Sequence, residues 1–224
     1  MSVNLEKYNE IKKELGTTKL VAVSKTKPNG DILELYGLGQ RDFGENYVQE
    51  LVDKEAALPK DIRWHFIGHL QRNKVKYIVS FVHLIHGVDS FKLLQEINKQ
   101  AAKHNRIIDC LLQVHIAQEE TKFGLNETEL EEALAGAVTL SHVRVCGLMG
   151  MASFSDDGEK VRGEFRFLKA LFDKGRAWSV VRSEWGILSM GMSGDYAIAI
   201  EEGSTMVRIG SLLFGARSYQ EKGI

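Results

Sequence analysis

Short apolar runs alternate with longer amphipathic runs along the whole of this 224-residue chain. The short runs are almost continuously hydrophobic, as in Leu20-Val-Ala-Val23, and strands buried on both faces of a parallel sheet have this composition. The longer runs follow the helical period, since Phe91, Leu94 and Ile97 share one stripe and Lys92 lies off it. The pattern therefore predicts strands that alternate with helices.

Eight strands and seven intervening helices are expected, preceded by an amphipathic helix at residues 1–15. The strands are expected at 19–24, 42–44, 62–67, 82–87, 108–116, 143–149, 184–190 and 205–209. The helices are expected at 30–39, 47–58, 70–80, 90–103, 127–137, 158–174 and 196–202. This order favours an α/β fold, a single (β/α)8 TIM-type barrel with an extra N-terminal helix. A doubly wound open sheet is the alternative, because periodicity does not show closure. No linker or repeat interrupts the pattern, which predicts a single domain over residues 1–224.

Composition narrows the function classes. The formal charge is -1, whereas a nucleic-acid binder needs a basic face, so we expect no nucleic-acid partner. No apolar run approaches the roughly 18–20 residues that span a bilayer, and the first residues are not a signal peptide. We therefore expect a soluble cytoplasmic protein. Cys110 and Cys146 lie in apolar runs, which is typical of buried, reduced thiols rather than of a disulfide or a zinc site.

Lys25 follows the first strand directly and would emerge where barrel enzymes carry their chemistry. A single lysine after a strand is usually a solvated loop residue. The functional alternative is a Schiff-base lysine, whose amine must be neutral to attack a carbonyl. Burial, with Lys27 as a nearby like charge, would lower the pKa of Lys25 and favour that form.

Glycine-rich turns follow the seventh and eighth strands, at residues 189–195 and 208–211. Ser193 or Asp195 could cap the next helix, and Gly191 and Gly194 would let backbone N–H groups turn toward an anion. Barrels commonly bind phosphate at these two loops, so we favour a phosphate site over two ordinary turns.

The histidine pairs of the sequence do not indicate a metal site. His65 and His69 are four residues apart, but Gly68 separates a strand from the following segment, so the two histidines share no helix face. His83 and His86 lie on opposite sides of a strand, and we expect no metal site. The chain also lacks a nucleotide-binding phosphate loop and a nucleophile elbow.

Several blocks of the sequence together resemble the pyridoxal phosphate homeostasis proteins, of the YggS/PROSC type. The resemblance runs in order from about residue 19 to 219. The blocks are Leu20-Val-Ala-Val-Ser-Lys-Thr-Lys-Pro28, Phe43-Gly-Glu-Asn-Tyr-Val-Gln-Glu50, Trp64-His-Phe-Ile-Gly-His-Leu-Gln-Arg-Asn-Lys74, Gly147-Leu-Met-Gly-Met151, Leu188-Ser-Met-Gly-Met-Ser193, Thr205-Met-Val-Arg-Ile-Gly-Ser211 and Phe214-Gly-Ala-Arg217.

The resemblance implies a barrel similar to the N-terminal domain of alanine racemase, with pyridoxal 5'-phosphate (PLP) as its cofactor. It implies a PLP aldimine on Lys25, phosphate contacts from Ser193, Gly194, Gly210 and Ser211, Arg208 at the pyridine nitrogen, and Asn46 and Met149 lining the pocket. The sequence departs from the family at His115, where Asn is usual, and in its shorter N-terminal helix. The family is regarded as supporting PLP homeostasis and amino-acid balance without established turnover.

Arginine is permanently protonated and can only donate to a ring nitrogen, which leaves the ring a weak electron sink. We therefore expect a PLP carrier or regulator, monomeric, whose partners are PLP and amino acids or PLP-dependent apo-enzymes. One alternative is a weak amino-acid racemase with a second base such as Tyr47. Another is a cofactor-free enzyme that acts on a sugar phosphate through Lys25.

Overall fold

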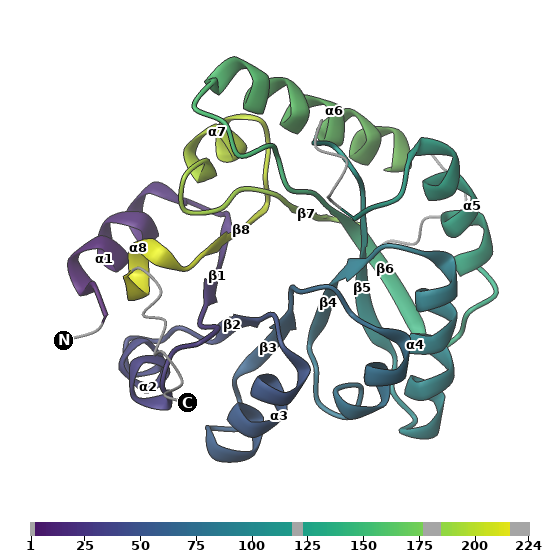
Figure 1. Cartoon of the computed structure of the whole chain (residues 1–224), viewed down its shortest axis with the longest axis horizontal. Coiled ribbons are helices and arrows are strands. Elements are labelled where there is room, and N and C mark those ends of the chain that lie inside the picture. The colour runs from purple at the N-terminus through teal and green to yellow at the C-terminus, as the bar shows by residue number, and fades with distance from the viewer. Residues whose placement is uncertain (1–2, 118–122, 177–184, 216–224) are drawn as a thin grey trace, which may run out of the picture.

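The computed structural model describes residues 3–117, 123–176 and 185–215. Eight parallel strands follow one another in chain order around a closed barrel, and helices cover its outside (Figure 1). β1 pairs with β8 from Lys19 opposite Met206 to Ala22 opposite Ile209, which closes the sheet. The expected barrel is confirmed, and the open doubly wound sheet is wrong.

The elements lie close to the positions predicted from the hydrophobic pattern. The strands are β1 Lys19–Val23, β2 Asp42–Glu45, β3 Arg63–Phe66, β4 Leu84–Val88, β5 Ile108–Gln113, β6 Val143–Met149, β7 Ile187–Ser189 and β8 Met206–Ile209. The helices are α1 Leu5–Glu14, α2 Asn29–Gly37, α3 Val48–Ala57, η1 Arg72–Tyr77, α4 Phe91–Lys103, α5 Glu127–Ala137, α6 Gly158–Arg176, α7 Tyr196–Glu201 and α8 Ser211–Phe214. Residues 1, 2 and 184, which the predicted first helix and seventh strand include, lie outside the described residues.

The helix predicted at residues 70–80 is instead the short 3₁₀ helix η1. Leu70, Val75, Ile78 and Val79 of the predicted helix are buried, so its apolar positions do face the barrel. The backbone N–H groups of Lys74 and Ile78 nevertheless donate to the carbonyls of Gln71 and Val75, three residues back, which is the 3₁₀ pattern. α4 shows the contrasting case. Ser90 accepts a hydrogen bond from the backbone N–H of Leu93 at its start, and an apolar stripe that includes Leu94 and Ile97 is buried.

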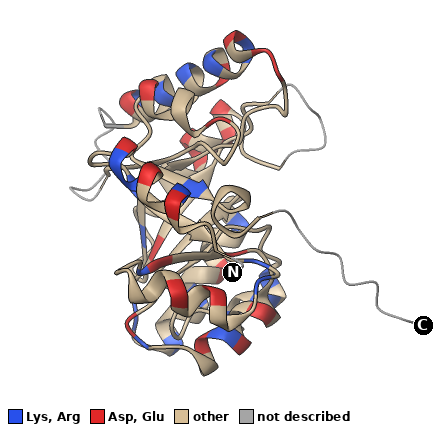
Figure 2. Cartoon of the chain, turned by 90° about the vertical axis from the view of Figure 1, so that its left-hand side faces the viewer, with Lys and Arg blue, Asp and Glu red and all other residues tan. Residues whose placement is uncertain are grey.

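Two hydrophobic clusters stabilise the barrel. The larger lies between the strands and the surrounding helices. The smaller fills part of the barrel interior with Val21, Leu84, Leu111, Cys146, Met149 and Met206. Lys, Arg, Asp and Glu are instead mixed over the outer faces of the helices (Figure 2). Among the described helices, none combines the length and the apolar character that a membrane span requires.

Candidate active-site cavity at the barrel mouth

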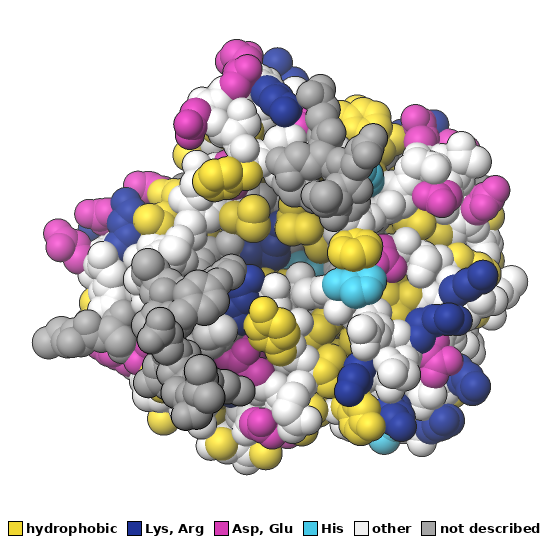
Figure 3. Space-filling view, in the orientation of Figure 1, with side chains coloured by type: hydrophobic (Ala, Val, Ile, Leu, Met, Phe, Trp, Pro, Cys, Tyr) yellow, Lys and Arg dark blue, Asp and Glu magenta, His cyan; other side chains and the backbone are white. Residues whose placement is uncertain are grey.

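A cavity of about 510 Å³ lies at the carboxyl ends of the strands. Figure 3 shows a hollow near the centre of one face, with Lys or Arg side chains inside it and hydrophobic side chains around it. Its lining comes from the segments after β1, β2, β3, β6, β7 and β8. The lining residues are Val23, Lys25, Lys27, Asn46, Ile67, Met151, Ser153, Phe154, Ser155, Asp156, Val161, Met192, Ser193, Gly194, Asp195, Arg208, Gly210, Ser211 and Gly215.

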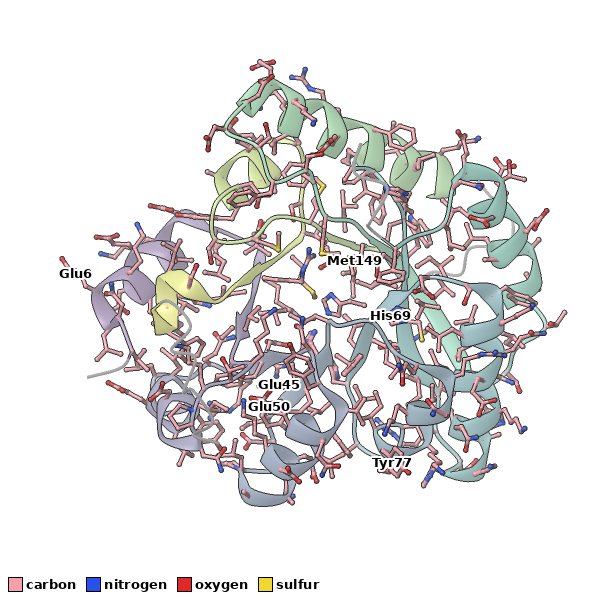
Figure 4. The ribbon with its side chains drawn as sticks, in the orientation of Figure 1. Glu6, Glu45, Glu50, His69, Tyr77 and Met149 are labelled. Carbon is pink, nitrogen blue, oxygen red and sulfur yellow. The ribbon has the colours of Figure 1, made fainter. Side chains whose placement is uncertain are left out.

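The cavity brings together seven of the eight residues that the sequence singled out. Those seven are Lys25, Asn46, Ser193, Gly194, Arg208, Gly210 and Ser211. Met149 is the exception, because its side chain is 1% exposed and belongs to the interior cluster (Figure 4). Met151 packs against that cluster and lines the cavity in its place. Met149 is the last residue of β6, whereas Met151 lies two residues further on, in the loop above the strand.

Side chains of α3 hold the backbone on both sides of Lys25, in the loop after β1. Lys54 donates from Nζ to the carbonyl of Ser24 at 2.7 Å, and the N–H of Thr26 donates to Glu50 Oε1 at 2.6 Å. Thr26 has φ +64°, a conformation that a non-glycine residue rarely adopts without support. The loop that carries Lys25 is therefore held on both sides.

The group that holds this loop is a buried cluster of charges. Lys54 is 5% exposed and donates to Glu45 Oε1 at 2.8 Å and to Glu50 Oε1 at 2.7 Å. Glu45 also accepts from Ser24 Oγ at 2.6 Å, and Figure 4 shows Glu45 and Glu50 close together. Burial raises the pKa of Glu45 to about 7, although Lys54 opposes this shift.

Lys27 also lines the cavity, but its amine is directed elsewhere. Its Nζ donates to the carbonyl of Phe214 in α8 at 2.6 Å. This bond ties the β1 loop to the segment after β8 and uses one of the donors of Lys27. Lys27 therefore lines the cavity while its amine also holds α8 against the β1 loop.

The turns after β7 and β8 contact each other directly. The N–H of Gly210 donates to Ser193 Oγ at 3.2 Å. A side chain at Gly194 would meet open space, whereas a Cβ at Gly210 would lie 3.1 Å from the carbonyl oxygen of Val23. Glycine at 210 therefore permits close packing of β8 against the end of β1. Asp195 occupies the N-cap position of α7, but its carboxylate accepts from the N–H of Met192 and not from the helix.

Arg208 reaches the cavity from inside the barrel and is only 4% exposed. Its Nη1 donates to the carbonyl and the hydroxyl of Ser189, at 2.9 and 2.7 Å, and its Nη2 donates to the carbonyl of Gly150 at 3.1 Å. Burial lowers the pKa of Arg208 to about 10, so the guanidinium stays charged at neutral pH. The cation is thus held in a fixed orientation.

The cavity suits an anionic ligand with polar atoms. Lys25, Lys27 and Arg208 supply positive charge, and the turns after β7 and β8 supply backbone N–H groups. Asn46 adds a second observation, because its Oδ1 is buried and, among the described residues, has no hydrogen-bond partner. A buried polar atom without a partner at a cavity wall is one that a ligand can satisfy.

Three further features bear on the alternatives weighed from the sequence. Tyr47, the suggested second base, is 57% exposed and does not line the cavity. His115 lies beyond β5 and does not line it either, although its N–H donates to the carbonyl of Leu125. Asp42, His65 and His83 have potential ligand atoms within 4.8 Å of one another, but both carboxylate oxygens of Asp42 already accept from Arg63.

Sequence reasoning missed the residues behind the cavity wall. The spacing of Glu50 and Lys54 on a predicted helix signals an ion pair, but nothing in it shows that the pair holds the Lys25 loop. His86 and Ser189 bond across the barrel although 103 positions separate them. Only the folded structure brings them together.

Comparison with known proteins places these residues in a wider group. The family model for the N-terminal domain of alanine racemase matches residues 4–218. The chain is 46% identical over 203 residues to the pyridoxal phosphate homeostasis protein of Aquifex aeolicus, covering 90% of this chain and 88% of the relative. It is 40% identical over 219 residues to the human protein of the same name, covering 91% and 78%.

Solved structures agree with this relationship. PipY of Synechococcus elongatus without PLP has a TM-score of 0.88 at 33% identity, with 94% of this chain and 99% of PipY covered. The structure of PipY with PLP bound has a TM-score of 0.85, at the same identity and coverage. Alanine racemase from Bartonella henselae, at 15% identity, has a TM-score of 0.71 over 94% of this chain and 59% of its own, and shows the shared fold.

Proposed function

Since this chain belongs to the family of the pyridoxal phosphate homeostasis proteins, we propose that it binds PLP in the barrel-mouth cavity and supports intracellular PLP homeostasis and amino-acid balance. One observation carries the proposal. The cavity gathers Lys25, the buried Arg208 and the two glycine-containing turns from separate strand ends, in a barrel like that of PipY, which has been solved with PLP bound.

Each part of the cofactor has a matching group in the cavity. Lys25 would hold the aldehyde carbon through its side-chain amine, with Asn46 beside it. The phosphate would be held at the turns after β7 and β8, by Ser193, Gly194, Gly210 and Ser211. Arg208 would face the pyridine nitrogen, and Met149 would support the cavity from below.

PLP supplies an aldehyde that attaches to amines and a pyridine ring that withdraws electrons best when its nitrogen is protonated. Arg208 has no acceptor atom and would donate to that nitrogen, so it would keep the ring unprotonated. The arrangement favours holding the cofactor over reacting it. A racemase would also need an acid or base opposite Lys25, and Tyr47 lies outside the cavity lining.

The proposal extends to the protein's setting. We propose a single barrel domain that acts as a cytoplasmic monomer and exchanges PLP with amino acids or with PLP-dependent apo-enzymes. The family match over residues 4–218 supports a single domain, and the open cavity mouth supports exchange with a small amine.

The decisive test uses the purified protein with PLP. We expect a visible absorption band, and borohydride reduction followed by peptide mapping should place the pyridoxyl group on residue 25. Lys25→Ala should lose both the band and the label, whereas Lys27→Met should keep the label on residue 25. A lysine enzyme without cofactor would show no visible band.

The same samples test how the phosphate is held. PLP should bind the wild-type protein at least about tenfold more tightly than pyridoxal does, because a phosphate gains several charge-assisted hydrogen bonds. A Lys25→Ala protein that retains the full chromophore, or a label on residue 27, would contradict the assignment of Lys25.

A further inference from the structure

A continuous chain of buried polar side chains crosses the barrel interior, from the amino end of β2 to Arg208 at the mouth. Asp42 Oδ1 lies 3.0 Å from His65 Nε2. His65 Nδ1 lies 2.9 Å from His86 Nε2, and His86 Nδ1 lies 3.1 Å from Ser189 Oγ. Ser189 Oγ accepts from Arg208 Nη1 at 2.7 Å. The five side chains from Asp42 to Arg208 come from strands β2, β3, β4, β7 and β8.

Chemistry assigns a direction to every bond in this chain. The Asp42 carboxylate accepts only, so His65 must donate from Nε2. A neutral His65 then has a bare Nδ1, and His86 must donate to it from Nε2. His86 Nδ1 is therefore an acceptor, and the Ser189 hydroxyl donates to it while accepting from Arg208. All the donors point from Arg208 toward Asp42, with no mismatch along the chain.

The charges at the two ends are fixed by their surroundings. Asp42 is buried, but hydrogen bonds from Arg63 and His65 hold its pKa below the ordinary value. Burial lowers the pKa of both His65 and His86, so both rings are neutral at pH 7. The chain thus joins a carboxylate to a guanidinium through two neutral rings.

This arrangement explains how the barrel tolerates Arg208. The bonds described for its guanidinium go to the uncharged Ser189 and Gly150, and the nearby Asp195 favours its charged form. A buried cation is costly unless opposite charges and dipoles are aimed at it. The hydroxyl and the two rings present their acceptor sides toward Arg208 in series, and each bond polarises the next.

We propose that Ser189, His86 and His65 are positioning residues that fix the orientation of Arg208 toward the ligand in the cavity. The inference rests on the proposed PLP site for its consequence, but not for the chain of bonds itself. None of the three side chains lines the cavity, so each acts through Arg208. Ser189 is the link through which the chain reaches the guanidinium.

The first arm of the test uses the protein without PLP. Long-range proton–nitrogen NMR distinguishes the two neutral histidine tautomers and the charged ring. We expect His65 and His86 to be neutral and protonated on Nε2 at pH 7. A charged ring, or a proton on Nδ1 of either residue, would overturn the inference whether or not the protein binds PLP.

The second arm uses Ser189→Ala, which removes only the linking hydroxyl. Ser204→Ala is the matched control, because the Ser204 hydroxyl is also buried and, within the described part of the chain, bonds only to the backbone carbonyls of Leu188, Met190 and Met206. Ser189→Ala should weaken PLP about fivefold to tenfold, as expected for one hydrogen bond to a charged group. It should also shift the absorption maximum of bound PLP, because the donor at the ring nitrogen moves.

The outcomes separate the two proposals. Wild-type protein that fails to bind PLP contradicts the proposed function and leaves the tautomer result to decide on the chain of bonds. If wild-type protein binds PLP, and Ser189→Ala matches Ser204→Ala in both affinity and absorption maximum, the positioning role is wrong. Circular dichroism and urea unfolding of both variants identify any loss of affinity that comes from unfolding.

Discussion

His86 illustrates how a single residue in this barrel constrains its neighbours. Its ring is fully buried, with one nitrogen bonded to His65 and the other to Ser189. Burial is the main reason its pKa lies well below 6.5, and the nearby His65, Arg208 and His83 lower it further, while Asp42 opposes them. Protonation would place a second positive charge beside Arg208 and would also break the bond from Ser189.

A pH dependence of stability follows from this burial. Below pH 6.5 the unfolded chain takes up a proton at His86 that the folded protein does not, so the contribution of His86 lowers the free energy of unfolding as the pH falls and vanishes above 6.5. One such group contributes a slope of up to about 1.4 kcal/mol per pH unit. Urea unfolding of wild-type and His86→Gln protein between pH 5 and 7.5 measures it.

The variant should show the shallower slope, even though its stability at pH 7 is lower. His104→Gln, at an exposed position, provides the control and should keep the wild-type slope. Glu45 contributes the opposite slope between its ordinary pKa of 4.5 and about 7, so the comparison uses differences between proteins. Equal slopes for wild-type and His86→Gln would show that His86 is not held neutral.

At the scale of elements, the strands position the site only because they approach one another closely. Gly147 in β6 has φ +151°, and a Cβ there would lie 1.8 Å from the carbonyl oxygen of Ile187 in β7. Gly163 in α6 has the opposite surroundings, since a Cβ there would meet nothing within 4 Å. The same residue type is therefore required in one element and replaceable in the other.

Alanine substitutions at these two glycines should act in opposite directions. Gly147→Ala must push β6 and β7 apart and adopt a conformation that alanine disfavours, so we expect a loss of several kcal/mol or failure to fold. Gly163→Ala should stabilise the protein by about 0.5–1 kcal/mol, because alanine favours the helix. Thermal and urea unfolding measure both, and a Gly147→Ala protein of wild-type stability would contradict the close approach.

The elements also show what the sequence could and could not predict. Periodicity located β1 and β8, and with them Lys25 and Arg208, because strand ends are visible as the ends of apolar runs. The bonds of Lys54 to Ser24 and Glu45 were not predictable, since they depend on how α3 packs against two strands. Periodicity also failed at η1, because the apolar spacing of residues 70–80 fits an α-helix although the backbone at 72–77 forms a 3₁₀ helix.

At the scale of the molecule, all the residues described as lining the cavity belong to a single barrel. Ser211 and Gly194 at its rim are exposed, so the mouth is open to water and to small amines. Racemases need two acid–base groups in a site that excludes water. Besides Lys25, the cavity is lined by the positively charged Arg208, which donates hydrogen bonds but cannot accept them.

We therefore expect slow exchange of the α-proton when L-amino acids are mixed with the PLP-loaded protein. In heavy water, deuterium should appear at the α-carbon at a rate close to that with free PLP, because Arg208 leaves the ring a weak electron sink. NMR and chiral chromatography follow exchange and racemisation. Exchange many orders of magnitude above the free-PLP rate would favour a racemase.

The pairing of β1 with β8 has a consequence for how the chain is made. Lys19 to Ala22 find their partners only at Met206 to Ile209, so this seam joins the two ends of the barrel sequence. During synthesis β1 must wait with one edge of backbone donors and acceptors unpaired until β8 has emerged. Such a distant closure makes folding slow and leaves the growing chain open to wrong strand pairing. Because Lys25 follows β1 and Arg208 lies in β8, the site itself is assembled in that same final step.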